Sequence, residues 1–353
     1  MSRRGRRRRA GSAVDGVLVL DKPAGPTSHD LVAETRLALD TPAVGHAGTL
    51  DPMATGVLVL GVGEGTKLVP YLTAEDKVYE ATLQLGASTT TLDAEGAVTD
   101  RRPLPEALDR RAVEAVASRF LGPHLQRAPA VSAIKRAGVP LHERVRRGEQ
   151  VEAPLREVRL DAVEVLGVDS TEGRIALRLS CGKGFYVRSF GRDLAEGLGT
   201  VGHLVALRRT RSGAFAADAT TTEATRVITE AARRLRDREE LPPEERSVLR
   251  RRAREQLWPL GAAWRGRPMA WVDDPGARDV RHGRPVAPDR ILRAEPVSLP
   301  AADAPIALLD AEGRLLAIAA PRPDGGLRVL RGFSPSPETP PSPTGAPPSP
   351  QDG

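Results

Sequence analysis

The stretch GHAGTLDPMATGVLVLGVGEGTK, residues 45–67, surrounds one carboxylate with small residues and then continues into an apolar run. The carboxylate is Asp51, which stands between Leu50 and Pro52, and the apolar run is Val57–Leu60. An Asp-Pro pair usually marks a turn. A carboxylate among small residues can also be a reactive group, because a substrate can approach the backbone closely there. The composition of this loop leaves both interpretations open.

The composition bounds the class of protein. A chain of 353 residues, 40% hydrophobic and 28% charged, is long enough for one sizeable domain and a smaller one. A single cysteine, Cys181, excludes an intrachain disulfide framework and a multi-cysteine zinc site, and the six histidines show no ligand spacing. The apolar run Val17–Leu20 is too short for a signal peptide, and no stretch approaches the ~20 apolar residues of a membrane helix. We therefore expect a cytoplasmic protein without a metal ion.

The net charge of +6 is concentrated at the N-terminus. Six arginines lie in MSRRGRRRR, and without them 46 basic residues balance 46 acidic ones. The run is either an unstructured solubilising end or an arm that seeks the phosphates of a nucleic acid.

Hydrophobic periodicity predicts a sequence of strands and helices. We expect a strand at 17–20, a helix capped by Thr27 or Ser28 that runs to about Leu39, and a strand at Val57–Val62. A short helix at 65–76 should be limited by Pro70. Alternation predicts two further strands, one with Tyr79, Ala81, Leu83 and Leu85 on one face and one with Ile175, Leu177, Leu179 and Cys181 together.

The C-terminal third has a different composition. Residues 222–257 are charged and helix-rich, which is typical of a solvated helical face. Short β-like runs follow tryptophans 258, 264 and 271 and predict a small β-rich domain to about Phe333, before a disordered Pro/Ser-rich tail. The glycine-rich GVGEGTK fits neither phosphate-binding template, so no nucleotide cofactor is expected.

Five segments in order resemble one family. GHAGTLDPMATG resembles the signature loop GHxGxLDPxATGxL of the TruB-type tRNA pseudouridine synthases. The other four are VLVLDKPAGPTS, KVYEATLQLG, SAIKRAGVPLHERVRRG and CGKGFYVRSFGRDLAEGLGTVGHLVALRRTRSGAF. They are similar to the family's first motif, tyrosine strand, central segment and third motif, and together they span residues 15–218.

The resemblance implies an isomerase that converts uridine 55 in the T arm of tRNA to pseudouridine. The glycosidic bond breaks, the uracil rotates and a carbon–carbon bond forms, so no cofactor is required. The implied fold is α+β, a mixed and largely antiparallel central sheet with flanking helices, followed by a small β-rich PUA-like domain. Two alternatives stay open: a non-catalytic RNA-binding or tRNA-folding protein on the same scaffold, and a related synthase that acts on another RNA.

We divide the chain into a disordered arm (1–13), a catalytic domain (14–221), a charged helical segment (222–257), the PUA-like RNA-binding domain (258–333) and a disordered tail (334–353). We expect a monomer that binds the T-arm stem-loop.

By resemblance, Asp51 is the catalytic carboxylate, acting on the sugar or on the uracil ring. Tyr79 matches the tyrosine that stacks on the target base, with a core tyrosine as the plain alternative. Tyr186 and Arg188 are two apart and are expected on one face of a strand, where Arg188 would keep Asp51 ionised. Leu207 matches an apolar wall of the uracil pocket.

The remaining positions concern RNA contacts. His46 matches the histidine that fills the space left by the flipped base, and Asp93 matches an aspartate near it. Lys22 and Lys135 are similar to family contacts with the RNA backbone or phosphates, unless they are ordinary surface lysines. Two departures from the family pattern, Thr90 in place of an acid and His142 in place of a tyrosine, put details of RNA contact in doubt.

Overall fold

A computed structural model of the chain describes residues 14–130, 153–236, 241–296 and 304–334, with the backbone of 135–136 and 139–140. The Arg-rich arm, the side chains of Lys135 and His142, and the Pro/Ser-rich tail lie outside the described residues, so the predictions about them stay predictions. Within the described chain, no helix is long and apolar enough to cross a membrane.

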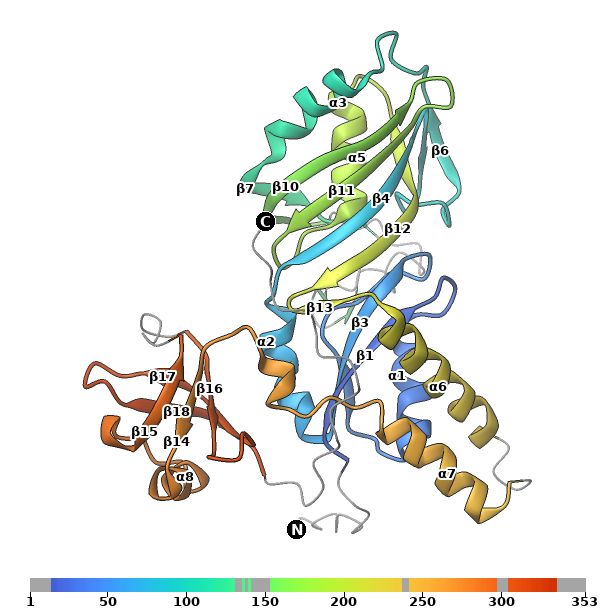
Figure 1. The fold of residues 1–353 in the computed structure, drawn as a ribbon. Coiled ribbons are helices and arrows are strands. Elements are labelled where there is room, and N and C mark those ends of the chain that lie inside the picture. The colour runs from blue at the N-terminus through green and yellow to red at the C-terminus, as the bar shows by residue number, and fades with distance from the viewer. Residues whose placement is uncertain are drawn as a thin grey trace, which may run out of the picture.

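A nine-stranded sheet runs through the N-terminal part of the chain (Figure 1). Its path is β1-β3-β12-β4-β11-β10-β7, with β2 paired to β3 and β13 to β12. The strands are β1 (Gly16–Lys22), β2 (Val44–His46), β3 (Thr55–Val62), β4 (Lys77–Leu85), β7 (Gly122–Arg127), β10 (Leu155–Asp169), β11 (Arg174–Cys181), β12 (Gly202–Ser212) and β13 (Phe215–Ala216). Neighbours are antiparallel except β3 and β12, which are parallel. The expected mixed, largely antiparallel sheet is confirmed.

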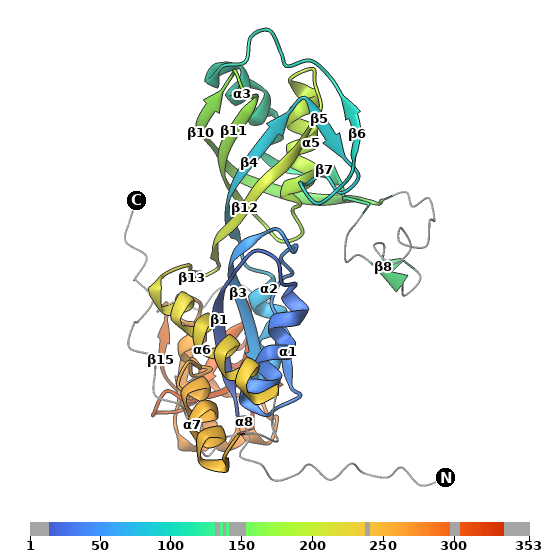
Figure 2. The same cartoon turned by 90° about the vertical axis from the view of Figure 1, so that its right-hand side faces the viewer.

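Helices flank the two ends of this sheet. The helices α1 (Ser28–Leu39), α6 (Ala219–Arg236) and α7 (Pro243–Arg254) pack together beside β1, whereas α3 (Arg110–Ala117) and α5 (Val187–Gly197) pack on the other end (Figure 2). Shorter elements complete this part: η1 (Gly63–Lys67), α2 (Val69–Thr73), β5 (Ala87–Thr89), β6 (Val98–Arg101), η2 (Ser118–Phe120), β8 (Lys135–Arg136) and β9 (Val139–Pro140).

Local sequence explains where these elements begin and what they bury. Thr27 caps α1 through a reciprocal capping box with Asp30, as predicted. Ala81, Leu83 and Leu85 of β4 are buried, and so are Ile175, Leu177, Leu179 and Cys181 of β11. The charged segment 222–257 is solvated on one side, but α6 buries Ala224, Ile228, Ala231 and Leu235 in the main core.

A five-stranded sheet forms the C-terminal part, in the order β15-β14-β16-β17-β18. Its elements are η3 (Ala262–Trp264), β14 (Met269–Val272), α8 (Asp274–Arg281), η4 (Pro288–Arg290), β15 (Ile291–Glu295), β16 (Ile306–Leu309), β17 (Leu315–Pro321) and β18 (Leu327–Gly332). This sheet agrees with the predicted PUA-like domain.

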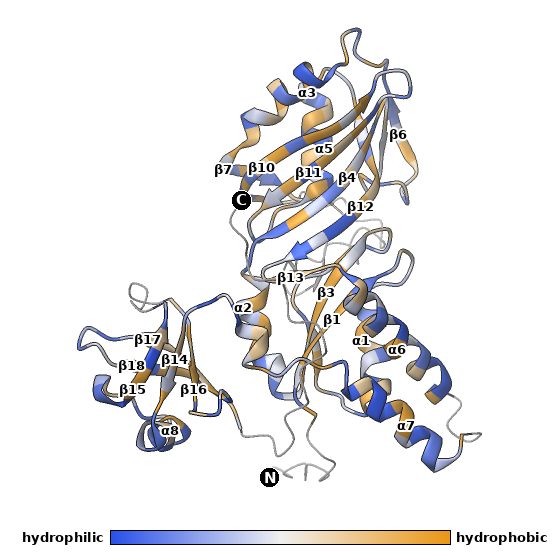
Figure 3. Ribbon diagram, in the orientation of Figure 1, coloured by the Kyte–Doolittle hydropathy of each residue, from blue (hydrophilic) through white to orange (hydrophobic). Residues whose placement is uncertain are grey.

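The strands β1 and β3 belong to two cores at once. Leu18, Leu20, Leu58 and Leu60 point into the main core, whereas Val17, Val19, Val57 and Val59 join Trp258, Trp264, Met269, Leu309 and Phe333 in a second core that we call the shared core. Both strands are apolar throughout this region (Figure 3). The backbone of Trp258 also exchanges two hydrogen bonds with that of Val17, at 2.7 and 3.0 Å. The C-terminal sheet therefore shares a core with β1 and with β3, the strand that follows the Asp51 loop.

Candidate active site

The loop that carries Asp51 connects β2 to β3, and two of its glycines have conformations that other residues rarely adopt. Gly48 has a φ of 113° and Gly56 a φ of 103°. A Cβ at Gly56 would lie 2.1 Å from the carbonyl oxygen of Arg209 in the neighbouring strand β12. The small residues of this loop are therefore required for the chain to turn and to pair with β12.

Three buried polar side chains hold the loop from behind. The hydroxyl of Ser28, at the start of α1, accepts from the Leu50 amide at 2.8 Å and donates to the Leu50 carbonyl at 3.1 Å. Lys22 Nζ donates to the carbonyls of Pro52 and Ala54 at 3.0 and 2.7 Å. These bonds fix the backbone on both sides of Asp51.

Arg209 is the third anchor and was not predicted. Its guanidinium is buried and donates to the carbonyls of Val57, Gly48 and Thr49 at 2.7, 3.1 and 3.5 Å. Leu207 and Arg209 are two residues apart on β12, so both point toward the loop, while the intervening Arg208 forms a bidentate pair with Asp21 at 2.7 and 2.9 Å.

The carboxylate of Asp51 forms the predicted ion pair with Arg188. The contact is bidentate: Nε lies 2.8 Å from Oδ2 and Nη2 lies 3.0 Å from Oδ1. The Arg188 side chain is 6% exposed, and its Nη1 donates to the Thr91 carbonyl at 2.8 Å and lies 3.4 Å from the buried Asp93. One guanidinium thus connects two carboxylates and a carbonyl, and a fork of this kind fixes orientation as well as charge.

Tyr186 and Arg188 are not on a strand, so that expectation is wrong. Tyr186 is the N-cap of α5, and Arg188 lies in the first turn of that helix. The buried Gln126 of β7 explains where the helix starts: its side chain accepts from the Tyr186 amide at 2.9 Å and donates to the Tyr186 carbonyl at 3.1 Å. Both side chains still face the same cavity.

A cavity of about 380 Å³ opens over Asp51. Its lining brings together five of the predicted residues: Asp51, Tyr79, Tyr186, Arg188 and Leu207. Its size suits a small organic group such as a nucleobase, with an aromatic ring and an apolar side chain available for a planar ring.

Burial controls the charge state of the site. Loss of solvent raises the pKa of Asp51 above that of an ordinary aspartate, Arg188 opposes this rise, and the charge of Asp93 adds to it. Burial also raises the pKa of Tyr79, so its phenol is protonated at neutral pH. Among the described residues, no three His, Cys, Asp or Glu side chains gather as metal ligands would.

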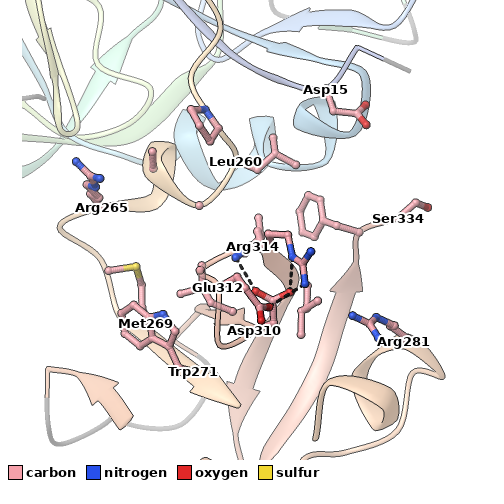
Figure 4. Close-up of a pocket in the computed structure, with 18 of the residues that line it drawn as sticks. Asp15, Leu260, Arg265, Met269, Trp271, Arg281, Asp310, Glu312, Arg314 and Ser334 are labelled. Carbon is pink, nitrogen blue, oxygen red and sulfur yellow. Dashed lines mark hydrogen bonds and ion pairs between the residues drawn. The ribbon is translucent and has the colours of Figure 1, made fainter. Parts of the chain in front are cut away.

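A larger cavity of about 510 Å³ lies beside the C-terminal sheet (Figure 4). It contains none of the predicted site residues. Asp310 in its wall accepts hydrogen bonds from the amide and Nε of Arg314, at 2.8 and 2.7 Å.

Comparison with known proteins identifies the family. Residues 36–187 match the TruB family pseudouridylate synthase (N terminal domain). The tRNA pseudouridine synthase B of Thermobifida fusca is 51% identical over 207 residues, which are 57% of this chain and 70% of that protein. The protein of the same name from Corynebacterium glutamicum is 48% identical over 202 residues, covering 57% and 68%. The chain belongs to the TruB family of pseudouridine synthases.

Solved structures support the TruB fold over nearly the whole chain. A chain of the archaeal box H/ACA sRNP Nop10-Cbf5 complex superposes with a TM-score of 0.66 at 22% identity, covering 92% of this chain and 88% of that one. A chain of an H/ACA RNP bound to a substrate RNA containing 2′-deoxyuridine gives a TM-score of 0.65 at 23% identity, covering 91% and 86%. At these identities the likeness concerns the fold alone.

Lys22, which the TruB resemblance suggested as an RNA contact, is not a surface lysine. Its side chain is fully buried, and a third donor bond of 2.9 Å to the Pro23 carbonyl completes the coordination of its ammonium. Burial lowers the pKa of Lys22 to about 8. The residue holds the Asp51 loop from inside the protein.

Asp93, the second residue suggested as an RNA contact, lies inside the protein beside Arg188. It is buried, and its carboxylate accepts from the Glu95 amide at 3.1 Å and from the Thr91 hydroxyl while facing Arg188. These partners make it a support of the arginine that pairs with Asp51.

His46 is half-buried outside the lining of the Asp51 cavity. It lies at the end of β2, and its ring meets that of His29 edge to face, with centroids 5.3 Å apart. Its Nδ1 is buried without a hydrogen-bond partner among the described residues, and burial lowers the pKa of the imidazole. His46 is therefore neutral at physiological pH, which suits insertion into a base stack.

Proposed function

We propose that this chain converts uridine 55 in the T arm of tRNA to pseudouridine, with Asp51 as the catalytic carboxylate. Membership of the TruB family makes it a pseudouridine synthase, and its closely similar relatives are named for action on tRNA. The observation that carries the assignment of the site is the bidentate pair of Asp51 and Arg188 in the lining of a cavity that Tyr79 and Leu207 also line.

The reaction needs a carboxylate that is ionised although it is enclosed. The C1′–N1 bond must break, the uracil must rotate, and the C1′–C5 bond must form. These steps require that the Asp51 carboxylate acts as a nucleophile or a proton acceptor, and that the site retains the detached uracil. Arg188 stabilises the charged form of Asp51 against burial, and its fork directs the carboxylate oxygens. Tyr79 and Leu207 would hold the uracil ring between an aromatic and an apolar surface while it turns.

The target uridine must leave its stack before it reaches Asp51. His46 is proposed to occupy the space that the base vacates, because a neutral imidazole can stack without bringing a charge into the RNA. Its position outside the cavity that holds Asp51 is consistent with a role in RNA opening. The T arm as the recognised element, and a single copy of the chain as the active unit, belong to this proposal.

The test is an assay of purified protein on a T-arm stem-loop with Asp51→Asn as the decisive variant. We expect pseudouridine with the wild type, none with Asp51→Asn, and RNA binding within a few-fold of wild type because many other contacts hold the RNA. Asp161→Asn, which changes an exposed carboxylate of β10 paired with Arg159, is the control and should retain full turnover. Measurable isomerisation by the Asp51 variant would exclude it as the catalytic group.

A further inference from the structure

The cavity over Asp51 is lined by cationic side chains that the chemistry on uracil does not use. Besides Tyr79 and Tyr186, its lining includes Thr73, Lys77, Arg156 and the loop 182–184, which contains Lys183 between two glycines. Among the described residues that line the cavity, five are cationic and Asp51 alone is anionic. Uracil is neutral, so this excess of positive charge requires another explanation.

Three of the five cations already have partners. Arg188 is paired with Asp51, Arg209 with the loop carbonyls, and Lys77 Nζ donates to the carbonyls of Thr73 and Glu75. The side chains of Arg156 and Lys183 are exposed and make no ion pair or hydrogen bond within the described chain. The uncompensated charge of the cavity lining is therefore carried by these two residues.

The fold holds Arg156 close to Tyr186, in the lining of the same cavity. Arg156 lies opposite Gln126 in the pairing of β10 with β7, and Gln126 is bonded to the backbone of Tyr186. The charge of Arg156 acts on the Tyr186 phenol, and the first turn of α5 contributes Val187 and Arg188 to the same cavity. Two free cations and the positive end of a helix thus face one space.

We propose that Arg156 and Lys183 bind an RNA phosphate next to the uridine that enters the cavity. A flipped nucleotide carries its flanking phosphates to the mouth of the pocket, and phosphate contacts fix the register of an RNA without reading its sequence. The two side chains would hold the sugar-phosphate backbone at one end while Tyr79 and Leu207 hold the base at the other. This assignment rests on the proposed function.

The experiment removes single charges from the RNA and from the protein and measures whether the resulting losses of affinity depend on each other. The probes are T-arm stem-loops with one uncharged methylphosphonate on the 5′ side of the target uridine, on its 3′ side, or in the distant stem. Their dissociation constants are measured with the wild type, Arg156→Ala, Lys183→Ala and Arg119→Ala. Arg119 is an exposed arginine on η2 without a partner in the described chain, so its variant is the matched control for loss of one charge.

We expect one flanking methylphosphonate to weaken wild-type binding about tenfold, the scale of a charge-assisted hydrogen bond. Arg156→Ala and Lys183→Ala should each weaken binding of the unmodified RNA by a similar factor. On the RNA with that methylphosphonate they should cause little further loss of affinity, because the phosphate charge that these side chains would bind is already absent. Arg156→Lys and Lys183→Arg should keep most of the affinity, and Arg119→Ala should act equally on every probe.

Losses that add fully on both flanking probes, or a coupling of equal size for Arg119→Ala, would overturn the assignment. The natural stem-loop is assayed for pseudouridine in parallel. Turnover without coupling would refute the phosphate site and leave the function standing, whereas absence of turnover by the wild type would refute the function itself.

Discussion

Two neighbours act on the pKa of Asp51 in opposite directions: Arg188 lowers it and Asp93 raises it. The pair with Arg188 could be expected from the family resemblance of GFYVRS. The anchors Ser28 and Arg209 could not, because a side chain that binds backbone carbonyls of a distant loop leaves no periodic pattern. The sequence feature that could have indicated Arg209 is its position two residues after Leu207, which places a charged side chain on the inward face of β12.

The pH dependence of turnover should report the Asp51 network. Because Asp51 must be ionised, the single-turnover rate should fall as pH drops through its pKa, with a midpoint above the 3.8 of an ordinary aspartate. Arg188 lowers this pKa, so Arg188→Lys, which loses the fork, should move the midpoint to higher pH. Asp93 raises it, so Asp93→Asn should move the midpoint to lower pH.

Circular dichroism at each pH defines the range in which both variants stay folded. Shifts of the two midpoints in the same direction would contradict this account.

Arg209 should act on chemistry through the position of the loop. Arg209→Lys keeps the charge but offers one ammonium to carbonyls that lie apart. A displacement of about 1 Å can cost about 100-fold in rate, so we expect a large loss in the single-turnover rate with little change in RNA affinity. Arg208→Lys, at the adjacent position paired with Asp21, is the control and should retain the rate. Equal losses in the two variants would remove the special role of Arg209.

At the scale of elements, the alternating strands and the first helix were predictable, and the start of α5 was not. The alternation of FYVR favours a strand, but Gln126 satisfies the backbone of Tyr186 from a segment 60 residues earlier, and a helix begins there instead. Arg188 reaches the cavity in either case, which is why the site prediction survived an incorrect element.

Gly56, where β3 pairs with β12, should be the loop residue whose substitution destabilises the protein most. Gly56→Ala combines a positive φ with a Cβ that meets the backbone of Arg209, so we expect a loss of about 2 kcal/mol or more in the free energy of unfolding. Gly45→Ala, in the same motif, meets nothing within 4 Å and should stay within about 0.5 kcal/mol of wild type. Urea denaturation measures both, and similar midpoints for the two variants would refute the steric argument.

At the scale of the molecule, the shared core joins what composition suggested were separate parts. The clustered tryptophans marked the change of domain, but their contact with β1 and β3 was not predictable, because these strands are apolar on both faces and give no orientation. Trp264 is fully buried against Tyr71, with ring centroids 5.6 Å apart, and Trp258 pairs with Val17.

One cooperative unfolding transition should follow from this packing. Trp264→Ala should lower the free energy of unfolding by about 3–5 kcal/mol, and near- and far-ultraviolet circular dichroism should still report a single midpoint. Trp271→Ala, which removes a half-buried ring stacked on Arg293, should cost much less. Two separate transitions in the wild type would show that the C-terminal sheet unfolds independently.

The shared core also has a consequence for folding during translation. Val57 and Val59 follow the Asp51 loop directly, yet the core to which they belong includes Leu309 and Phe333, which the ribosome adds some 250 residues later. During translation this core therefore stays incomplete after the residues that line the Asp51 cavity have been synthesised. We expect β1 and β3 to reach their final packing only once the C-terminal sheet has emerged.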